Sequence, residues 1–72
     1  MTNDTPKGQY SVIVFFEDDT KPKKWEYVNK LNGFALFLKT KHATWAYFNV
    51  YDRKKGVYLK RFYKKDFVPA FL

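Results

Sequence analysis

The residues best suited to binding chemistry lie close together, in the segment YDRKKGVYLKRFYKK at positions 51–65. This segment holds seven of the fourteen basic residues of the chain and four aromatic rings. Lysine and arginine neutralise phosphates, and flat rings stack on nucleic-acid bases for about 1–3 kcal/mol per base. The combination predicts a surface that binds nucleic acid, single-stranded rather than double-stranded, with little sequence preference.

The charge of the chain is confined to its second half. Residues 1–36 hold five lysines and five acidic residues, whereas residues 37–72 hold nine basic residues against Asp52 and Asp66. The whole net charge of +7 therefore belongs to residues 37–72. Such asymmetry favours an anionic partner, although it does not distinguish DNA from RNA.

Catalytic and metal-binding residues are poorly represented. His42 is the one histidine, Ser11 lies within an apolar run, and the chain has no cysteine, so no pair of nucleophile and base can be assembled. The acidic residues 17–19 match no calcium-loop spacing and are better explained as a solvated turn. We therefore expect a protein that is not an enzyme and that has no cofactor and no metal.

Length and composition predict one small domain. A chain of 72 residues builds a single core, and without cysteine that core depends on eight Phe, six Tyr and two Trp. The polar residues 1–9 are expected to form a flexible tail and residues 10–72 the compact domain. No apolar stretch approaches the ~20 residues of a membrane span, and the lack of cysteine suits a cytoplasmic protein.

Apolar patterning predicts four strands, over residues 10–17, 25–31, 45–52 and 57–65. Residues 33–42 fit two structures. The pair Asn32-Gly33 between apolar runs is a hairpin signal, but Phe34, Phe37 and Leu38 share one face at helical spacing, which favours a helix. The predicted fold class is therefore α+β, with the order ββαββ, an antiparallel sheet and one helix on one face. The alternative is a five-stranded small barrel of the SH3 or OB type.

Successive side chains of a strand point to opposite faces of the sheet. If this strict alternation continues outward from the predicted loop 53–56, it assigns each side chain of the last two strands to one face. Asp52 then pairs with Val57. The face under the helix receives Ala46, Phe48, Val50, Val57, Leu59 and Arg61. The exposed face receives Trp45, Tyr47, Asn49, Tyr51, Tyr58, Lys60, Phe62 and Lys64. The predicted nucleic-acid-binding residues are Trp45, Tyr47, Tyr51, Arg53, Lys54, Lys55, Tyr58, Lys60, Phe62 and Lys64.

Two other interpretations of the same residues remain open. The rings could form ordinary cross-strand pairs, with the lysines protecting a sheet edge from aggregation. Alternatively, the aromatic surface could dock on a protein, since Tyr and Trp anchor interfaces as readily as they stack on bases. The chain would then be a small interaction protein of phage or plasmid type that inhibits or assists a host or replication enzyme. A homodimer is also compatible with the surplus of rings, whereas a membrane partner is not expected.

Overall fold

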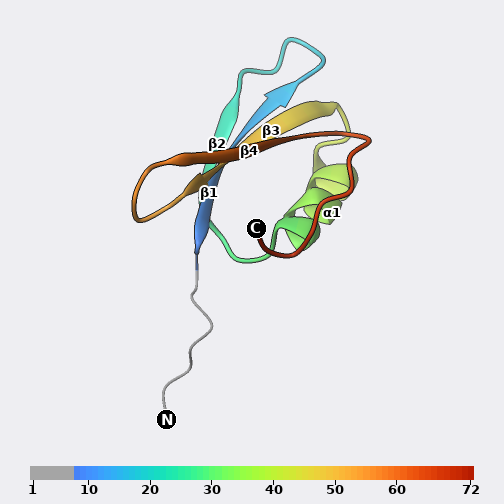
Figure 1. Cartoon of the computed structure of the whole chain (residues 1–72). Coiled ribbons are helices and arrows are strands. Elements are labelled where there is room, and N and C mark those ends of the chain that lie inside the picture. Colours follow the sequence, from blue (N-terminus) through green and yellow to red (C-terminus); the bar gives the residue numbers. More distant parts are fainter. Residues whose placement is uncertain (1–7) are drawn as a thin grey trace.

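The computed structural model describes residues 8–72, which form four strands and one helix (Figure 1). The elements are β1 (Tyr10–Phe16), β2 (Lys23–Val28), α1 (Leu31–Lys41), β3 (Trp45–Asp52) and β4 (Tyr58–Tyr63). The strands make one antiparallel sheet in the order β2-β1-β3-β4. The predicted α+β class and the order ββαββ are confirmed, and the five-stranded barrel does not form in this part of the chain.

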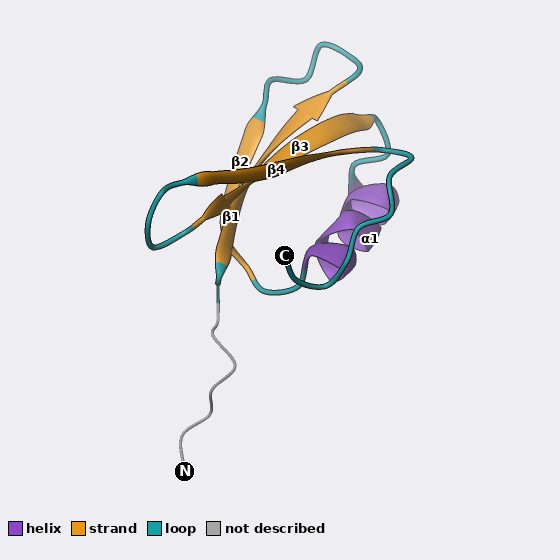
Figure 2. Cartoon of the chain, in the orientation of Figure 1, coloured by secondary structure: helices purple, strands orange, loops and turns teal. Residues whose placement is uncertain are grey.

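Helix α1 packs on one face of the sheet, which we call the helix face (Figure 2). Leu31, Phe34 and Leu38 are its buried residues, and they lie on one side because they are separated by three and four positions. Lys39 and Lys41 lie in the last turn, where the helix dipole favours positive charge. The helix expected over residues 33–42 is thus confirmed, although it begins earlier, at Leu31.

The core lies between α1 and the two central strands, β1 and β3. Tyr10, Val12 and Val14 of β1 alternate towards the helix, and Phe48 and Val50 of β3 do the same beside them. Phe48 contacts Phe34 of α1 edge-to-face, with ring centroids 5.5 Å apart. Burial of these rings and branched chains, at about 1.5–3 kcal/mol for each full side chain, supplies the main stabilisation of the domain.

The segment after β4 contacts both the helix and the sheet. It runs beside α1 in Figure 1, and Val68 packs against the core. The Ala70 carbonyl accepts a hydrogen bond from the Leu31 N–H (2.8 Å), and the Leu72 N–H donates to the Tyr10 hydroxyl (2.9 Å). The Ala70 contact satisfies an amide of the first helical turn, which lacks a side-chain cap.

The flexible tail predicted for residues 1–9 falls mainly on residues 1–7, outside the described residues. Gly8 and Gln9 are held by the domain: the Gly8 N–H donates to the Asn29 side chain, and the Arg53 N–H donates to the Gln9 carbonyl (3.2 Å). Within residues 8–72, no helix is long and apolar enough to cross a membrane.

Candidate binding surface on the open face of the sheet

The face of the sheet opposite α1 is not covered by any element of residues 8–72, and we call it the open face. Strand pairing places aromatic side chains of three strands on it. They are Phe15 of β1, Tyr47 and Tyr51 of β3, and Tyr58 and Tyr63 of β4. Tyr58 and Tyr63 are about half exposed, at 53% and 51%. The open face is therefore an aromatic surface.

The register of β4 differs from strict alternation. Tyr51 pairs with Tyr58, as the predicted pairing of Asp52 with Val57 requires, but Val50 pairs with Lys60 rather than Leu59. Leu59 is thus the extra residue of a β-bulge, and it reverses the orientation of everything that follows it in the strand. The predicted face assignment is therefore wrong from Lys60 onward.

Four of the predicted site residues consequently lie on the helix face or within the core. Phe62 is 2% exposed and packs on Phe48, with ring centroids 5.6 Å apart. Lys60 lies over the Phe62 ring, and the Lys64 ammonium donates to the Ala43 carbonyl at the helix side. Trp45 is 3% exposed, because a second bulge in the pairing of β1 with β3 turns it inward opposite Phe16.

The rings of the open face contact one another across the strands. Phe15 and Tyr47 stack, with centroids 4.8 Å apart and 20° between their planes, and Tyr63 lies beyond Tyr47 at 5.5 Å. Towards the other end of β3, Tyr51 and Tyr58 meet edge-to-face at 5.8 Å. The face thus has two groups of rings separated along β3 by Asn49.

Arg61 lies between the two groups and is held by its neighbours. Its Nε donates to the Oδ1 of Asn49 (2.8 Å), and its NH1 donates to the Tyr63 hydroxyl (3.4 Å). The guanidinium lies 4.4 Å from the centroid of the Tyr47 ring. The hydrogen bond to Tyr63 raises the pKa of Arg61 above its ordinary value.

The arrangement leaves most of the guanidinium available for a ligand. Arginine has five N–H donors, of which these contacts use two, so three remain on an exposed side chain. A guanidinium fixed in orientation loses less conformational entropy when it binds a phosphate or carboxylate through two hydrogen bonds. Arg61 is therefore a pre-oriented anion-binding group in the middle of an aromatic surface.

The loop that joins β3 to β4 lies at the predicted position, since the Asp52 N–H donates to the Val57 carbonyl (2.8 Å). Gly56 has a φ of 69°, and the Asp52 carboxylate accepts a hydrogen bond from the Lys55 N–H (2.9 Å). Lys54 and Lys55 are exposed at the tip. Arg53 is half-buried instead, because its Nε donates to the Gly8 carbonyl and its guanidinium lies 4.9 Å from the Tyr27 ring centroid. Lys54 and Lys55 therefore remain candidates for phosphate contacts, whereas Arg53 has a structural role.

No protein-family model, no curated protein and no solved structure matches this chain. The function of the open face is therefore inferred from its geometry alone. Among residues 8–72 there is also no group of three or more His, Asp or Glu side chains that could hold a metal ion.

Sequence reasoning identified part of the open face and missed the rest. Tyr47, Tyr51 and Tyr58 lie there as predicted, whereas Phe15, Arg61 and Tyr63 were not assigned to it. A signal for the bulge was present in the sequence. Strict alternation would direct the charged Arg61 under the helix and the apolar Phe62 into water, and burial of an unpaired charge is costly.

Proposed function

We propose that the chain is a non-enzymatic binding protein whose open face holds single-stranded nucleic acid with little sequence preference. The observation that carries the proposal is Arg61, fixed by Asn49 and Tyr63 between two groups of exposed rings. Rings supply stacking surfaces for bases of any identity, and a guanidinium supplies a phosphate contact. The cytoplasmic location expected from the sequence suits this role.

The spacing of the exposed rings fits an extended strand. Tyr58 and Tyr63 pair with Tyr51 and Tyr47, which are four residues apart on β3, so the two rings are separated by about 13 Å along the sheet. Arg61 lies between them, and Lys54 and Lys55 extend the positive charge at the Tyr58 end. We infer that one base stacks on each tyrosine and that Arg61 contacts a phosphate between them.

The test compares two neighbouring cations on opposite faces of β4. Arg61→Gln should weaken binding of a fluorescently labelled single-stranded oligonucleotide and reduce the slope of log K against log salt by about 0.7, the value for one lost phosphate contact. Lys60→Gln removes the same charge from the helix face and should leave the slope unchanged. Fluorescence anisotropy over a salt series measures both, and circular dichroism confirms that each variant is folded.

The stacking part of the proposal is tested separately. Tyr58→Ala and Tyr63→Ala should each weaken binding by about 1–3 kcal/mol, the usual contribution of one stacked base. Tyr27→Ala is the matched control, because Tyr27 is 72% exposed and lies against Arg53 rather than among the rings of the open face. Equal losses in all three variants would argue against a specific platform.

A protein partner is the second candidate, and one observation favours it. Both sides of the Tyr47 ring are occupied, by Phe15 and by the Arg61 guanidinium, so a base cannot stack on it without rearrangement. Packed tyrosines around an arginine are typical of the centre of a protein interface. Under this alternative the oligonucleotide does not bind at any salt concentration, and Arg61→Gln instead abolishes retention of one protein with weak salt dependence.

A further inference from the structure

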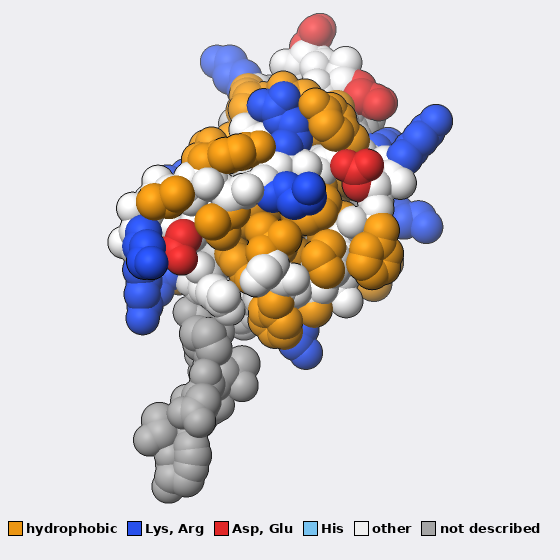
Figure 3. All heavy atoms as spheres, viewed as in Figure 1, with side chains coloured by type: hydrophobic (Ala, Val, Ile, Leu, Met, Phe, Trp, Pro, Cys, Tyr) orange, Lys and Arg blue, Asp and Glu red, His pale blue; other side chains and the backbone are white. Residues whose placement is uncertain are grey.

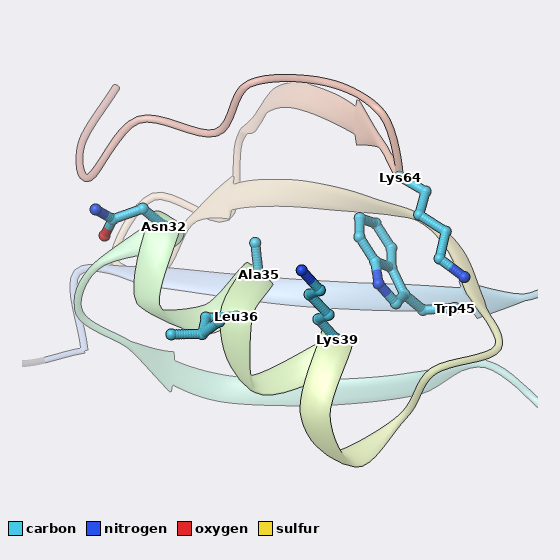
Figure 4. A pocket seen from close by; sticks show the side chains of 6 residues that line it. All are labelled: Asn32, Ala35, Leu36, Lys39, Trp45 and Lys64. Atoms are coloured by element: carbon cyan, nitrogen blue, oxygen red, sulfur yellow. The ribbon is translucent and has the colours of Figure 1, made fainter.

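A second candidate site lies on the other side of the sheet, between α1 and the segment that follows β4. It is a pocket of about 410 Å³. Its lining residues are Asn32, Ala35, Leu36, Lys39, Trp45 and Lys64. Figure 4 shows Lys39 rising from the helix on one side of the Trp45 ring and Lys64 descending on the other side. A volume of 300–1,000 Å³ is usual for pockets that bind small molecules.

Three of the six lining residues make an apolar wall. Trp45 is 3% exposed, and its ring packs on Phe48 with centroids 5.4 Å apart. Ala35 and Leu36 line the helix side, where Leu36 is 63% exposed. The space-filling view shows apolar side chains gathered along the course of the C-terminal segment, with basic side chains beside them (Figure 3). Such a surface favours an apolar or aromatic body in the ligand.

The charge of the pocket is of one sign. Its lining includes two lysines and no acidic residue, and neither lysine forms an ion pair within residues 8–72. The Lys64 ammonium donates to the Ala43 carbonyl (2.5 Å), which fixes its position and leaves two of its three N–H donors for another acceptor. The two ammonium groups come from different elements and lie on opposite sides of the Trp45 ring, so positive charge flanks the pocket and favours an anionic ligand.

We propose that this pocket binds a small organic anion, with its carboxylate or phosphate near the ammonium groups of the two lining lysines, Lys39 and Lys64. Its apolar or aromatic body would lie against the apolar lining residues Ala35, Leu36 and Trp45. Asn32 and Lys39 are seven helical residues apart, so the pocket extends about 10 Å along α1. This length accommodates a planar bicyclic or short aliphatic body. The site is on the helix face and shares no residue with the open face. Binding of an anion in the pocket is therefore independent of the proposed binding of nucleic acid on the open face.

The experiment uses indole-3-acetate as an anionic aromatic probe and indole-3-acetamide as its uncharged counterpart. In ¹H–¹⁵N NMR spectra of the full chain, the two tryptophan indole N–H signals are assigned with the variant Trp25→Phe. Indole-3-acetate should shift the Trp45 signal, with a dissociation constant on the order of 1 mM for a ligand of this size. Indole-3-acetamide should bind at least severalfold more weakly, and the Trp25 signal should not move with either probe.

Lysine substitutions test the charge that the proposal requires. Lys39→Met and Lys64→Met should each weaken binding of indole-3-acetate about three- to fivefold, the effect of one exposed ion pair, and leave the weak binding of the amide unchanged. Lys41→Met is the matched control, because Lys41 is exposed on the same helix but does not line the pocket. Equal affinities for the acid and the amide, or equal effects of all three substitutions, would overturn the proposal.

Discussion

Phe62 and Tyr63 are adjacent on β4, and the bulge at Leu59 determines which of them supports the core. Phe62 is 2% exposed and packs on Phe48, whereas Tyr63 is 51% exposed on the open face. Without the bulge the two side chains would exchange faces. Truncation of each to alanine therefore tests the register directly.

The two substitutions should differ strongly in their effect on the free energy of unfolding. Replacement of a buried phenylalanine by alanine costs about 3–5 kcal/mol. A domain of 72 residues has a total stability of about 4–11 kcal/mol, at 0.05–0.15 kcal/mol per residue, so Phe62→Ala removes a large part of it. Tyr63→Ala loses half-exposed surface, the contact with Tyr47 and one long hydrogen bond, which together amount to about 1 kcal/mol.

Urea denaturation followed by circular dichroism measures both values. If Phe62→Ala does not fold, Phe62→Leu provides a milder test, with an expected cost below about 1.5 kcal/mol and a measurable decrease in the denaturation midpoint. Leu59→Ala is the control for substitution at the bulge itself, where the side chain is 41% exposed. A cost for Tyr63→Ala equal to or above that for Phe62→Ala would refute the register and, with it, the assignment of Arg61 to the open face.

Two further predictions concern stability. A methyl group on the Cα of Gly33, within α1, would meet no atom within 4 Å apart from its chain neighbours and the backbone of its own helix, so Gly33→Ala should stabilise the protein by about 0.5–1 kcal/mol. Gly56 has a φ of 69°, so Gly56→Ala should destabilise the protein by about 1 kcal/mol. Thermal unfolding measures both changes. Hydrogen bonds from Thr20 hold the pKa of Asp18 below its ordinary value of 3.8. The stabilisation that these hydrogen bonds provide is present above the pKa of Asp18 in the unfolded chain, and it is lost as the pH falls through the lower pKa of Asp18 in the folded protein. The difference in the free energy of unfolding between the wild type and Asp18→Asn should therefore shrink on acidification below about pH 4.

The elements of the fold could be predicted because each has a local cause. The β3–β4 loop follows from Gly56 and Asp52, and the helix follows from the spacing of its apolar residues. The choice between helix and strand for residues 33–42 was closer, since the pair Asn32-Gly33 is also a hairpin signal. Burial of Phe34 and Leu38 against the sheet decides it.

The sequence holds a signal for the bulge at Leu59 but does not determine the register of either bulged strand, because the cause of the bulges is tertiary. Strict alternation would place the small Ala46 under the helix and expose Trp45, and it would bury Arg61 while exposing Phe62. One extra residue in each strand reverses both outcomes, so that Trp45 and Phe62 enter the core. At each bulge, the gain from burying one large ring exceeds the loss of one regular ladder position, but this comparison requires the position of the helix.

The bulge at Leu59 also divides the basic segment 51–65 into groups with different surroundings. Arg61 is on the open face, Lys60 and Lys64 are on the helix face, and Lys54 and Lys55 are at the loop tip. Arg53 is committed to Gly8 and Tyr27. These six of the seven basic residues of the segment therefore do not form one patch in space. Since a bound phosphate interacts mainly with charges within about 10 Å at moderate salt, the cations beside it contribute most to its binding. A ligand of the open face thus depends on the geometry of Arg61 more than on the net charge of +7.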